Sequence, residues 1–168
     1  MTSLVIDVRP ARAADAAQLA DVHEVAWREA YSGIIPALTL QRMIIRRSGP
    51  WWRDALARRP ILVLDVGGTV AGYASIAAGN SRGHPGAAEL QELYLRPEYQ
   101  GIGLGLRLFL AVLKRVKARG YSRVLVRALA DNDRANGFYA RHGGKVVART
   151  DETLGGRSLP CIWYEFRA

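Results

Sequence analysis

The chain has 168 residues, of which 49% are apolar and 23% charged, a balance typical of one globular domain with a sizeable core. No apolar run approaches the ~18–20 residues of a membrane span, and the N-terminus lacks the basic start and long apolar stretch of a signal peptide. A single cysteine, Cys161, excludes an internal disulfide. We therefore expect one domain over residues 1–168, in the cytoplasm and without a membrane partner.

The formal net charge of +9 is concentrated in the centre of the chain, where residues 96–149 hold twelve Lys and Arg against three Asp and Glu. Such a basic region attracts a phosphorylated cofactor, a nucleic acid or an acidic partner. Charge alone does not choose among these ligands, and any single basic residue is equally well explained as part of a solvated helix face.

The first half of the chain predicts one strand and three helical stretches. Residues 5–9 alternate as a short strand, and Asp15 with Gln18 predicts a capping pair for a helix that runs to about residue 31. Further helical stretches are expected over 37–47 and over 50–58, the latter with Pro50 in its first turn.

The second half predicts mainly strands. Two β-rich runs, 61–66 and 69–76, flank Gly67-Gly68 and indicate a hairpin, and 79–87 is expected to be a loop. The remaining strands are expected at 88–95, 123–129, 145–149 and 161–166, and the remaining helices at 104–119 and 133–141. One mixed sheet of about seven strands flanked by about four helices, an α/β fold, is the natural packing of these elements.

The segment 93–106 (LYLRPEYQGIGLGL) is the sharpest feature of the sequence, because it predicts a strand, a glycine-rich loop and a helix start in succession. Gly101, Gly103 and Gly105 let the backbone approach a ligand closely, and the free N–H groups of the helix start point at the same spot. This combination is typical of a phosphate or diphosphate site. A loop whose glycines only allow close packing of helix and strand stays open as the alternative.

Two common phosphate loops are excluded by their residues. A dinucleotide loop needs G-x-G-x-x-G followed by an acidic residue about twenty positions later, where this chain has Arg123. A Walker loop ends in Gly-Lys-Ser or Gly-Lys-Thr, and no such triplet follows.

The segment closely resembles the acetyl-CoA loop of the GNAT acetyltransferases, whose signature is Gln/Arg-x-x-Gly-x-Gly/Ala, with Gln100, Gly103 and Gly105 at its fixed positions. Downstream, residues 132–139 (NDRANGFY), followed by His142-Gly143, resemble the second signature of the family. Gly144 departs from the aromatic residue usual after that glycine, which concerns local packing. The resemblance implies the GNAT fold, acetyl-CoA as acyl donor, an amine as acceptor and a possible homodimer.

The resemblance also implies roles for individual residues. The backbone of Leu93, Tyr94 and Leu95 would face the acetyl carbonyl and the pantetheine arm. Asn132 would bond the pantetheine, and Tyr139 would be the general acid near the sulfur, although outside the family context a core aromatic is the commoner reading. The residues expected to hold the diphosphate are Gln100, Gly101, Ile102, Gly103, Leu104, Gly105 and Leu106.

Acetyl transfer to an amine needs a base, because the amine must be neutral when it attacks. Glu89 matches the position at which the family often carries this base, and Glu92 is the second candidate. An undistorted strand would point two residues three apart to opposite faces, and a bulge would change this. Each is equally well explained as an ordinary surface carboxylate.

The acceptor site is expected near residues 27–36 (WREAYSGIIP), which resemble a stretch that borders the acceptor cleft in small GNAT proteins. Trp27 and Tyr31 share a helix face, where both could simply pack on the sheet. Glu29 and Tyr31 are the acceptor-site candidates.

The other polar residues favour direct attack without a metal. The three histidines lack ligand spacing to one another or to Cys161, so we expect no metal, and Cys161 is expected to be a buried, inert thiol. Two alternatives to an enzyme stay open: a non-catalytic acyl-CoA-binding regulatory module, and a nucleic-acid-binding protein, which no recognition motif supports.

Overall fold

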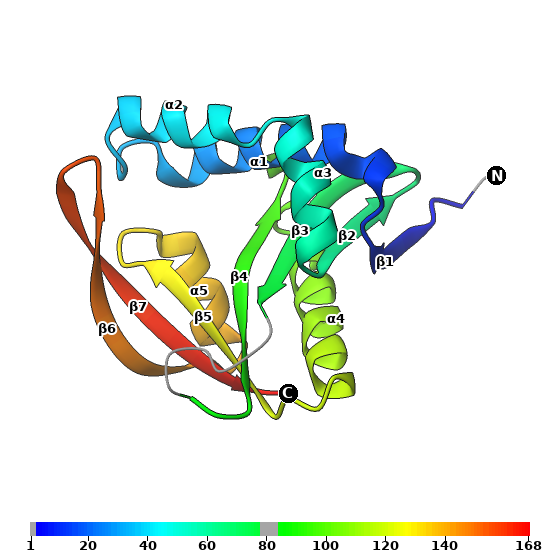
Figure 1. The fold of residues 1–168 in the computed structure, drawn as a ribbon. Helices are drawn as coiled ribbons and strands as arrows, with labels where there is room; N and C mark the ends of the chain where they lie inside the picture. Colours follow the sequence, from blue (N-terminus) through cyan, green and yellow to red (C-terminus); the bar gives the residue numbers. More distant parts are fainter. Residues whose placement is uncertain (1–2, 78–83) are drawn as a thin grey trace.

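A computed structural model describes residues 3–77 and 84–168, and these form one seven-stranded mixed sheet in the order β1-β2-β3-β4-β5-β7-β6 (Figure 1). Neighbouring strands are antiparallel except β4 and β5, which are parallel. The strands are β1 (Ile6–Pro10), β2 (Ile61–Val66), β3 (Thr69–Ala77), β4 (Ala87–Leu95), β5 (Arg123–Leu129), β6 (Lys145–Leu154) and β7 (Arg157–Arg167). The predicted seven-stranded α/β fold is confirmed.

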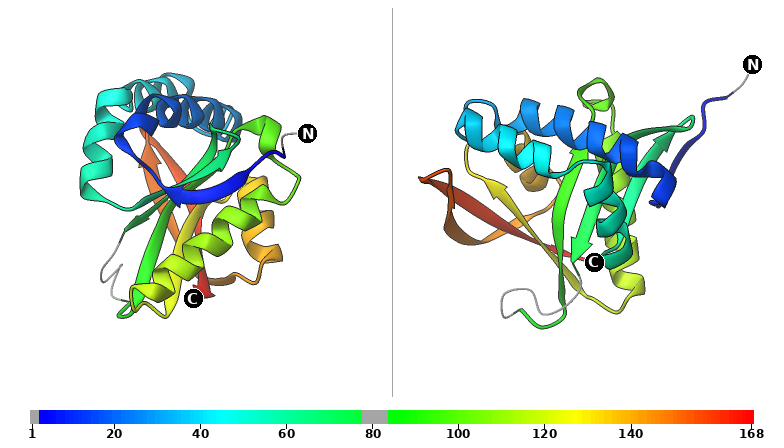
Figure 2. Two further views of the ribbon diagram at one scale, coloured as in Figure 1. Left: turned by 90° about the vertical axis from the view of Figure 1, so that its right-hand side faces the viewer. Right: turned by 45° about the horizontal axis from the view of Figure 1, so that its top comes forward.

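Five α-helices flank the sheet in the described residues, and each corresponds to one of the five predicted helical stretches. They are α1 (Ala16–Tyr31), α2 (Ala37–Arg46), α3 (Gly49–Arg58), α4 (Leu104–Ala118) and α5 (Asp133–Arg141). Figure 2 shows α1 to α3 on one side of the sheet and α4 and α5 on the other. None of the helices within the described ranges is both long and apolar enough to cross a membrane.

Two apolar layers, one on each face of the sheet, explain this arrangement. Leu19 of α1 and Trp52 of α3 pack on Tyr73 of β3. On the opposite face, Leu108 of α4 packs among residues of β2 to β5 such as Val126. The helical spacing of the apolar residues and the alternation along the strands thus bury both layers.

The predicted capping pair at the start of α1 is wrong. The carboxylate of Asp15 accepts hydrogen bonds from the guanidinium of Arg9 at 2.8 and 2.9 Å and from the backbone N–H of Arg12 at 2.7 Å. The side chain of Gln18 instead accepts a bond from the backbone N–H of Val70 at 2.9 Å. Because a charged partner binds a carboxylate more strongly than a backbone amide does, Asp15 turns to Arg9, and α1 begins at Ala16.

The last two strands are longer than predicted. They extend over Lys145–Leu154 and Arg157–Arg167 and are joined by Gly155-Gly156, both with positive φ. Most side chains of β6 are exposed, so the apolar alternation that marks a strand is missing there. Of the predicted loop 79–87, residues 79–83 lie outside the described part, and Ala87 already belongs to β4.

The parallel pair β4 and β5 opens into a gap that positions the site. Their pairing runs from Ala87 opposite Arg123 to Leu90 opposite Val126, yet β4 continues to Leu95 and β5 to Leu129. In the ladder with β3, Ser75 faces Glu92 and Ile76 faces Leu90, so Gln91 is the extra residue of a β-bulge. Figure 1 shows the two strands diverging toward α1 and α2. We call the gap between residues 91–95 of β4 and 127–129 of β5 the seam.

Candidate active site

The glycine-rich loop after β4 presents unsatisfied backbone N–H groups. Gly101 and Gly103 have φ of +78° and +84°, in the left-handed region that favours glycine. The first hydrogen bond of α4 runs from the N–H of Arg107 to the carbonyl of Gly103 at 3.2 Å, so the amides at 103–106 precede the helical ladder. A Cβ atom at Gly101 or Gly103 would meet no described atom within 4 Å. This open helix start fits an anionic group such as a diphosphate.

Gln100 ties this loop to the end of β4. Its Nε2 donates to the carbonyl of Leu95 at 3.1 Å and, more weakly, to the carboxylate of Glu29 at 3.5 Å. Glu29 also lies 3.8 Å from the guanidinium of Arg134. The acceptor-site candidate Glu29 therefore lies on the side of the glycine-rich loop, and it does not line the cleft described below.

The seam brings together several of the predicted site residues. Leu93, Tyr94, Asn132 and Tyr139 line a narrow cavity of about 30 Å³ between β4 and β5. The Oδ1 atom of Asn132 accepts a hydrogen bond from the backbone N–H of Ala135 at 3.3 Å and so caps α5. The second motif of the sequence thus folds against the strand of the first motif, although residues 96–131 separate them.

Tyr139 is both a core residue and a seam residue. It is 5% exposed, and its ring packs on Phe109, Tyr164 and Phe166. Burial raises the pKa of its hydroxyl above the ordinary value, so the group keeps its proton at neutral pH. The two readings of Tyr139, core aromatic and acid beside a ligand, are therefore compatible.

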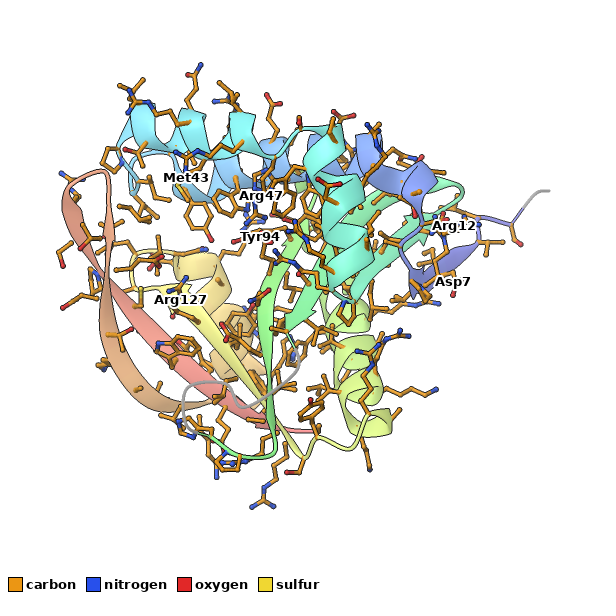
Figure 3. The ribbon with its side chains drawn as sticks, in the orientation of Figure 1. Asp7, Arg12, Met43, Arg47, Tyr94 and Arg127 are labelled. Carbon is orange, nitrogen blue, oxygen red and sulfur yellow. The ribbon has the colours of Figure 1, made fainter. Side chains whose placement is uncertain are left out.

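A larger cleft of about 290 Å³ opens on the other side of β4, below α1 and α2. Its lining includes Trp27, Tyr31, Arg47, Glu89 and Arg127. Figure 3 shows the labelled side chains of Met43, Arg47, Tyr94 and Arg127 around this region. Tyr31, Gln91, Glu92, Tyr94 and Arg127 line both the cleft and the seam, so the two cavities adjoin.

The bulge decides how the two candidate bases are oriented. Glu89 and Glu92 both line the cleft, because the extra residue Gln91 reverses the alternation between them. The two glutamates therefore face the same cleft, and not the opposite faces of the sheet that an undistorted strand would give them.

Glu92 is held by a buried network. Its carboxylate accepts bonds from Nη1 of Arg47 at 2.6 and 2.7 Å and from the hydroxyl of Tyr73 at 3.0 Å, and its side chain is 6% exposed. Cζ of Arg47 lies 5.2, 4.5 and 5.9 Å from the ring centroids of Trp27, Trp51 and Trp52, which adds cation–π attraction. The sequence analysis missed Arg47 and these two α3 tryptophans, since no local spacing links them to β4.

Tyr31 and Tyr94 join α1 to β4 above the seam. Their hydroxyl groups form a hydrogen bond with each other, and burial raises the pKa of both. The side chain of Tyr94 therefore faces the cleft, while its backbone borders the seam. Trp27 packs against both rings, so it is part of the core under α1 as well as of the cleft wall.

Two further expectations concern metals and the thiol. The described residues contain no group of three or more His, Cys, Asp or Glu side chains that could hold a metal ion. Cys161 is 1% exposed, which confirms the predicted buried thiol.

The open helix start, the seam and the adjoining cleft fit a transferase whose donor carries a diphosphate. The model of a family described as "Acetyltransferase (GNAT) family" matches residues 19–144. The chain belongs to this GNAT acetyltransferase family, as its motifs predict.

Individual relatives agree with this assignment. The chain is 26% identical over 155 residues to the N-acetyltransferase YuaI of Bacillus subtilis, covering 92% of this chain and 89% of that protein. It is 37% identical over 100 residues to the L-methionine sulfoximine/L-methionine sulfone acetyltransferase of Pseudomonas paraeruginosa, covering 56% and 57%. The PaiA N-acetyltransferase of Thermoplasma acidophilum, solved with coenzyme A, superposes with a TM-score of 0.80 at 23% identity over 98% of this chain and 99% of that one. At this identity the structural match shows the shared fold.

Proposed function

We propose that this GNAT acetyltransferase moves the acetyl group of acetyl-CoA to an amine by direct attack in a ternary complex. The observation that carries the proposal is that the open helix start at 101–106, the seam and the cleft meet at one end of β4. A donor lying along the loop and the seam would therefore present its thioester to an acceptor in the cleft.

The donor would be held mainly by the backbone. The amides at 101–106 would bind the diphosphate, and residues 93–95 would bind the pantetheine through the strand edge that β5 leaves unpaired. Asn132 would add its Nδ2 group. The complex of PaiA with coenzyme A supports the same donor class here.

The transfer itself needs two proton movements. The nitrogen lone pair of the amine attacks the thioester carbonyl, and the C–S bond breaks to give the amide and coenzyme A. Tyr139 would give a proton to the departing thiolate, since its hydroxyl is protonated at neutral pH. Backbone N–H groups of β4 at the seam would stabilise the developing oxyanion.

Of the two candidate bases, we favour Glu89, which lines the cleft and matches the position at which the family often carries its base. The carboxylate of Glu92 is occupied by Arg47 and Tyr73, so taking up a proton there would weaken a buried ion pair. We assign Glu92 the role of a positioning residue that fixes Arg47, and Glu89 the role of accepting the proton of the amine.

The acceptor class is narrowed by the cleft. A volume of about 290 Å³ is at the lower end of small-molecule sites, and the Pseudomonas relative is named for two small amino acid derivatives. We therefore favour a small-molecule amine over a protein amine. A single domain over residues 1–168, a cytoplasmic location and a homodimer stay predictions, and a nucleic-acid partner stays disfavoured.

The test combines binding and turnover. Acetyl-CoA should raise the melting temperature of the chain, and thiol release with a panel of amines should match the N-acetyl product found by mass spectrometry. A reaction without amine measures hydrolysis as the control. Binding of acetyl-CoA without thiol release from any amine would favour the regulatory module instead.

A further inference from the structure

Two arginines lie against the same indole at the wall of the acceptor cleft. Cζ of Arg47 lies 4.5 Å and Cζ of Arg59 lies 5.5 Å from the ring centroid of Trp51. The two arginines flank α3 in sequence, and both line the cleft. Because an indole orients a planar guanidinium through cation–π contact, one tryptophan orders two groups rich in N–H donors.

Both arginines keep donors for a ligand. Each guanidinium carries five N–H bonds. Arg47 donates to Glu92 through Nη1, and Arg59 donates to Oε1 of Gln91 through Nη1 at 2.9 Å. Within residues 3–77 and 84–168, neither Nε nor Nη2 of these two side chains bonds to another residue.

The charge of Arg59 is not balanced locally. The other two arginines of the cleft are paired with carboxylates, Arg47 with Glu92 at 2.6 Å and Arg127 with Glu152 at 2.9 Å. No carboxylate of the described chain lies within ion-pair distance of Arg59, whose hydrogen-bond partner is a neutral amide. The lining also includes the carboxylate of Glu89, so its three arginines and three glutamates balance overall, and Arg59 is a local cationic group that an anionic ligand group can contact.

This charge lies near the reaction centre. Gln91, the partner of Arg59, is the bulge residue of β4 and lines both the cleft and the seam. An acceptor that contacts Arg59 while its amine lies at the seam therefore carries an anionic group as well as an amine. A carboxylate matches the forked N–H geometry of a guanidinium, and an α-amino acid places a carboxylate and an amine on one carbon.

We propose that Arg59 and Arg47, ordered by Trp51, bind the carboxylate of the acceptor, and that the acceptor is an α-amino acid. This inference rests on the proposed function and adds the substrate class. The competing explanation is that Arg59 only fastens the bulge through Gln91.

The experiment compares amino acids with their carboxamides. L-leucine, L-methionine and L-phenylalanine and the three amides are assayed with saturating acetyl-CoA in the wild type, Arg59→Gln and Arg58→Gln. Arg58 is the matched control, because it is the exposed neighbour of Arg59 and does not line the cleft. Each kcat/KM is calculated for the concentration of neutral amine at the assay pH, and the ratio of acid to amide is then compared between the enzymes.

We expect the wild type to prefer the acids. Arg59→Gln should raise KM for the acids by about 10- to 100-fold, the range for losing a hydrogen bond to a charged group, and leave the amides nearly unchanged. Arg59→Lys should recover part of the loss, and Arg58→Gln should behave as the wild type. A thermal shift by the acids in the presence of coenzyme A, lost in Arg59→Gln, should give the same ranking without turnover.

Three results would overturn the inference. Equal use of acids and amides by the wild type would remove the carboxylate subsite. If Arg59→Gln lowers kcat/KM equally for the acids and the amides, Arg59 only holds the bulge through Gln91. If the enzyme acetylates other amines but no amino acid, the proposed substrate class is wrong and the proposed function is still supported. If no amine gives thiol release, both proposals are wrong.

Discussion

Because Glu92 and Glu89 are assigned different roles, replacing each by glutamine should change a different property, the stability for Glu92 and the turnover for Glu89. Glu92→Gln keeps the shape of the side chain but removes the charge that faces Arg47, and its new NH₂ group cannot accept a bond. Hydrogen bonds to a charged partner contribute about 1.5–3 kcal/mol and neutral ones about 0.5–1.5 kcal/mol. With three bonds to a 6% exposed carboxylate, we expect the free energy of unfolding to fall by about 2 kcal/mol.

Glu89→Gln should instead act on turnover. Removing a general base lowers kcat by about 10²- to 10⁴-fold, and the free energy of unfolding should change less than in Glu92→Gln. Urea unfolding followed by tryptophan fluorescence gives the stabilities, and the pH dependence of kcat/KM gives the role. Glu92→Gln should keep the wild-type shape of that profile. A Glu92→Gln enzyme of unchanged stability that loses the acidic limb, which reports the base, beside an active Glu89→Gln enzyme, would refute this assignment.

Three further predictions test the donor site and the core. Tyr139→Phe should lower kcat by about 10²-fold and leave the Kd for acetyl-CoA nearly unchanged, whereas equal turnover would remove the acid role. Gly103→Val should weaken acetyl-CoA binding. The control is Gly120→Val, because Gly120 has a similar positive φ but lies at the far end of α4, and this variant should bind acetyl-CoA as the wild type does. Equal affinities of the two variants for acetyl-CoA would contradict a donor site at the glycine-rich loop. His23 is fully buried, and burial lowers its pKa to about 3, so only the unfolded chain takes up a proton below pH 6.5. The contribution of His23 to the free energy of unfolding is therefore fully present above pH 6.5. It decreases as the pH falls toward 3, by about 2 kcal/mol at pH 5. His23→Leu should lose this pH dependence, and an equal fall in both proteins would disprove it.

The loop and the helix start that we propose to hold the donor could be predicted from the sequence because their signals are local. Gly101 and Gly103 stand where the backbone needs a positive φ, and the apolar spacing after Gly103 marks the start of α4. The bounds of β2, β5 and α5 agree with the prediction for the same reason, since alternation and capping residues act over a few positions.

The arginines of the cleft could not be predicted, because their contacts join distant parts of the chain. Arg47 meets Glu92 across 45 positions, and Arg59 meets Gln91 across 32. No spacing in the sequence marks either pair. The bulge at Gln91, which turns both glutamates into the cleft, likewise depends on the register with β3.

The C-terminal hairpin was underestimated for a different reason. Most side chains of β6 are exposed, so burial does not impose alternation on that strand, and Pro160 within β7 argues against a strand there. The pair Gly155-Gly156, both with positive φ, was the available signal of a turn.

The central claim is that the backbone amides after β4 hold the diphosphate of the donor. A crystal structure of the chain grown with coenzyme A tests it most directly. We expect the diphosphate on the N–H groups at 101–106 and the pantetheine in the seam between β4 and β5. Coenzyme A bound at another surface, or no bound molecule at saturating concentration, would contradict it.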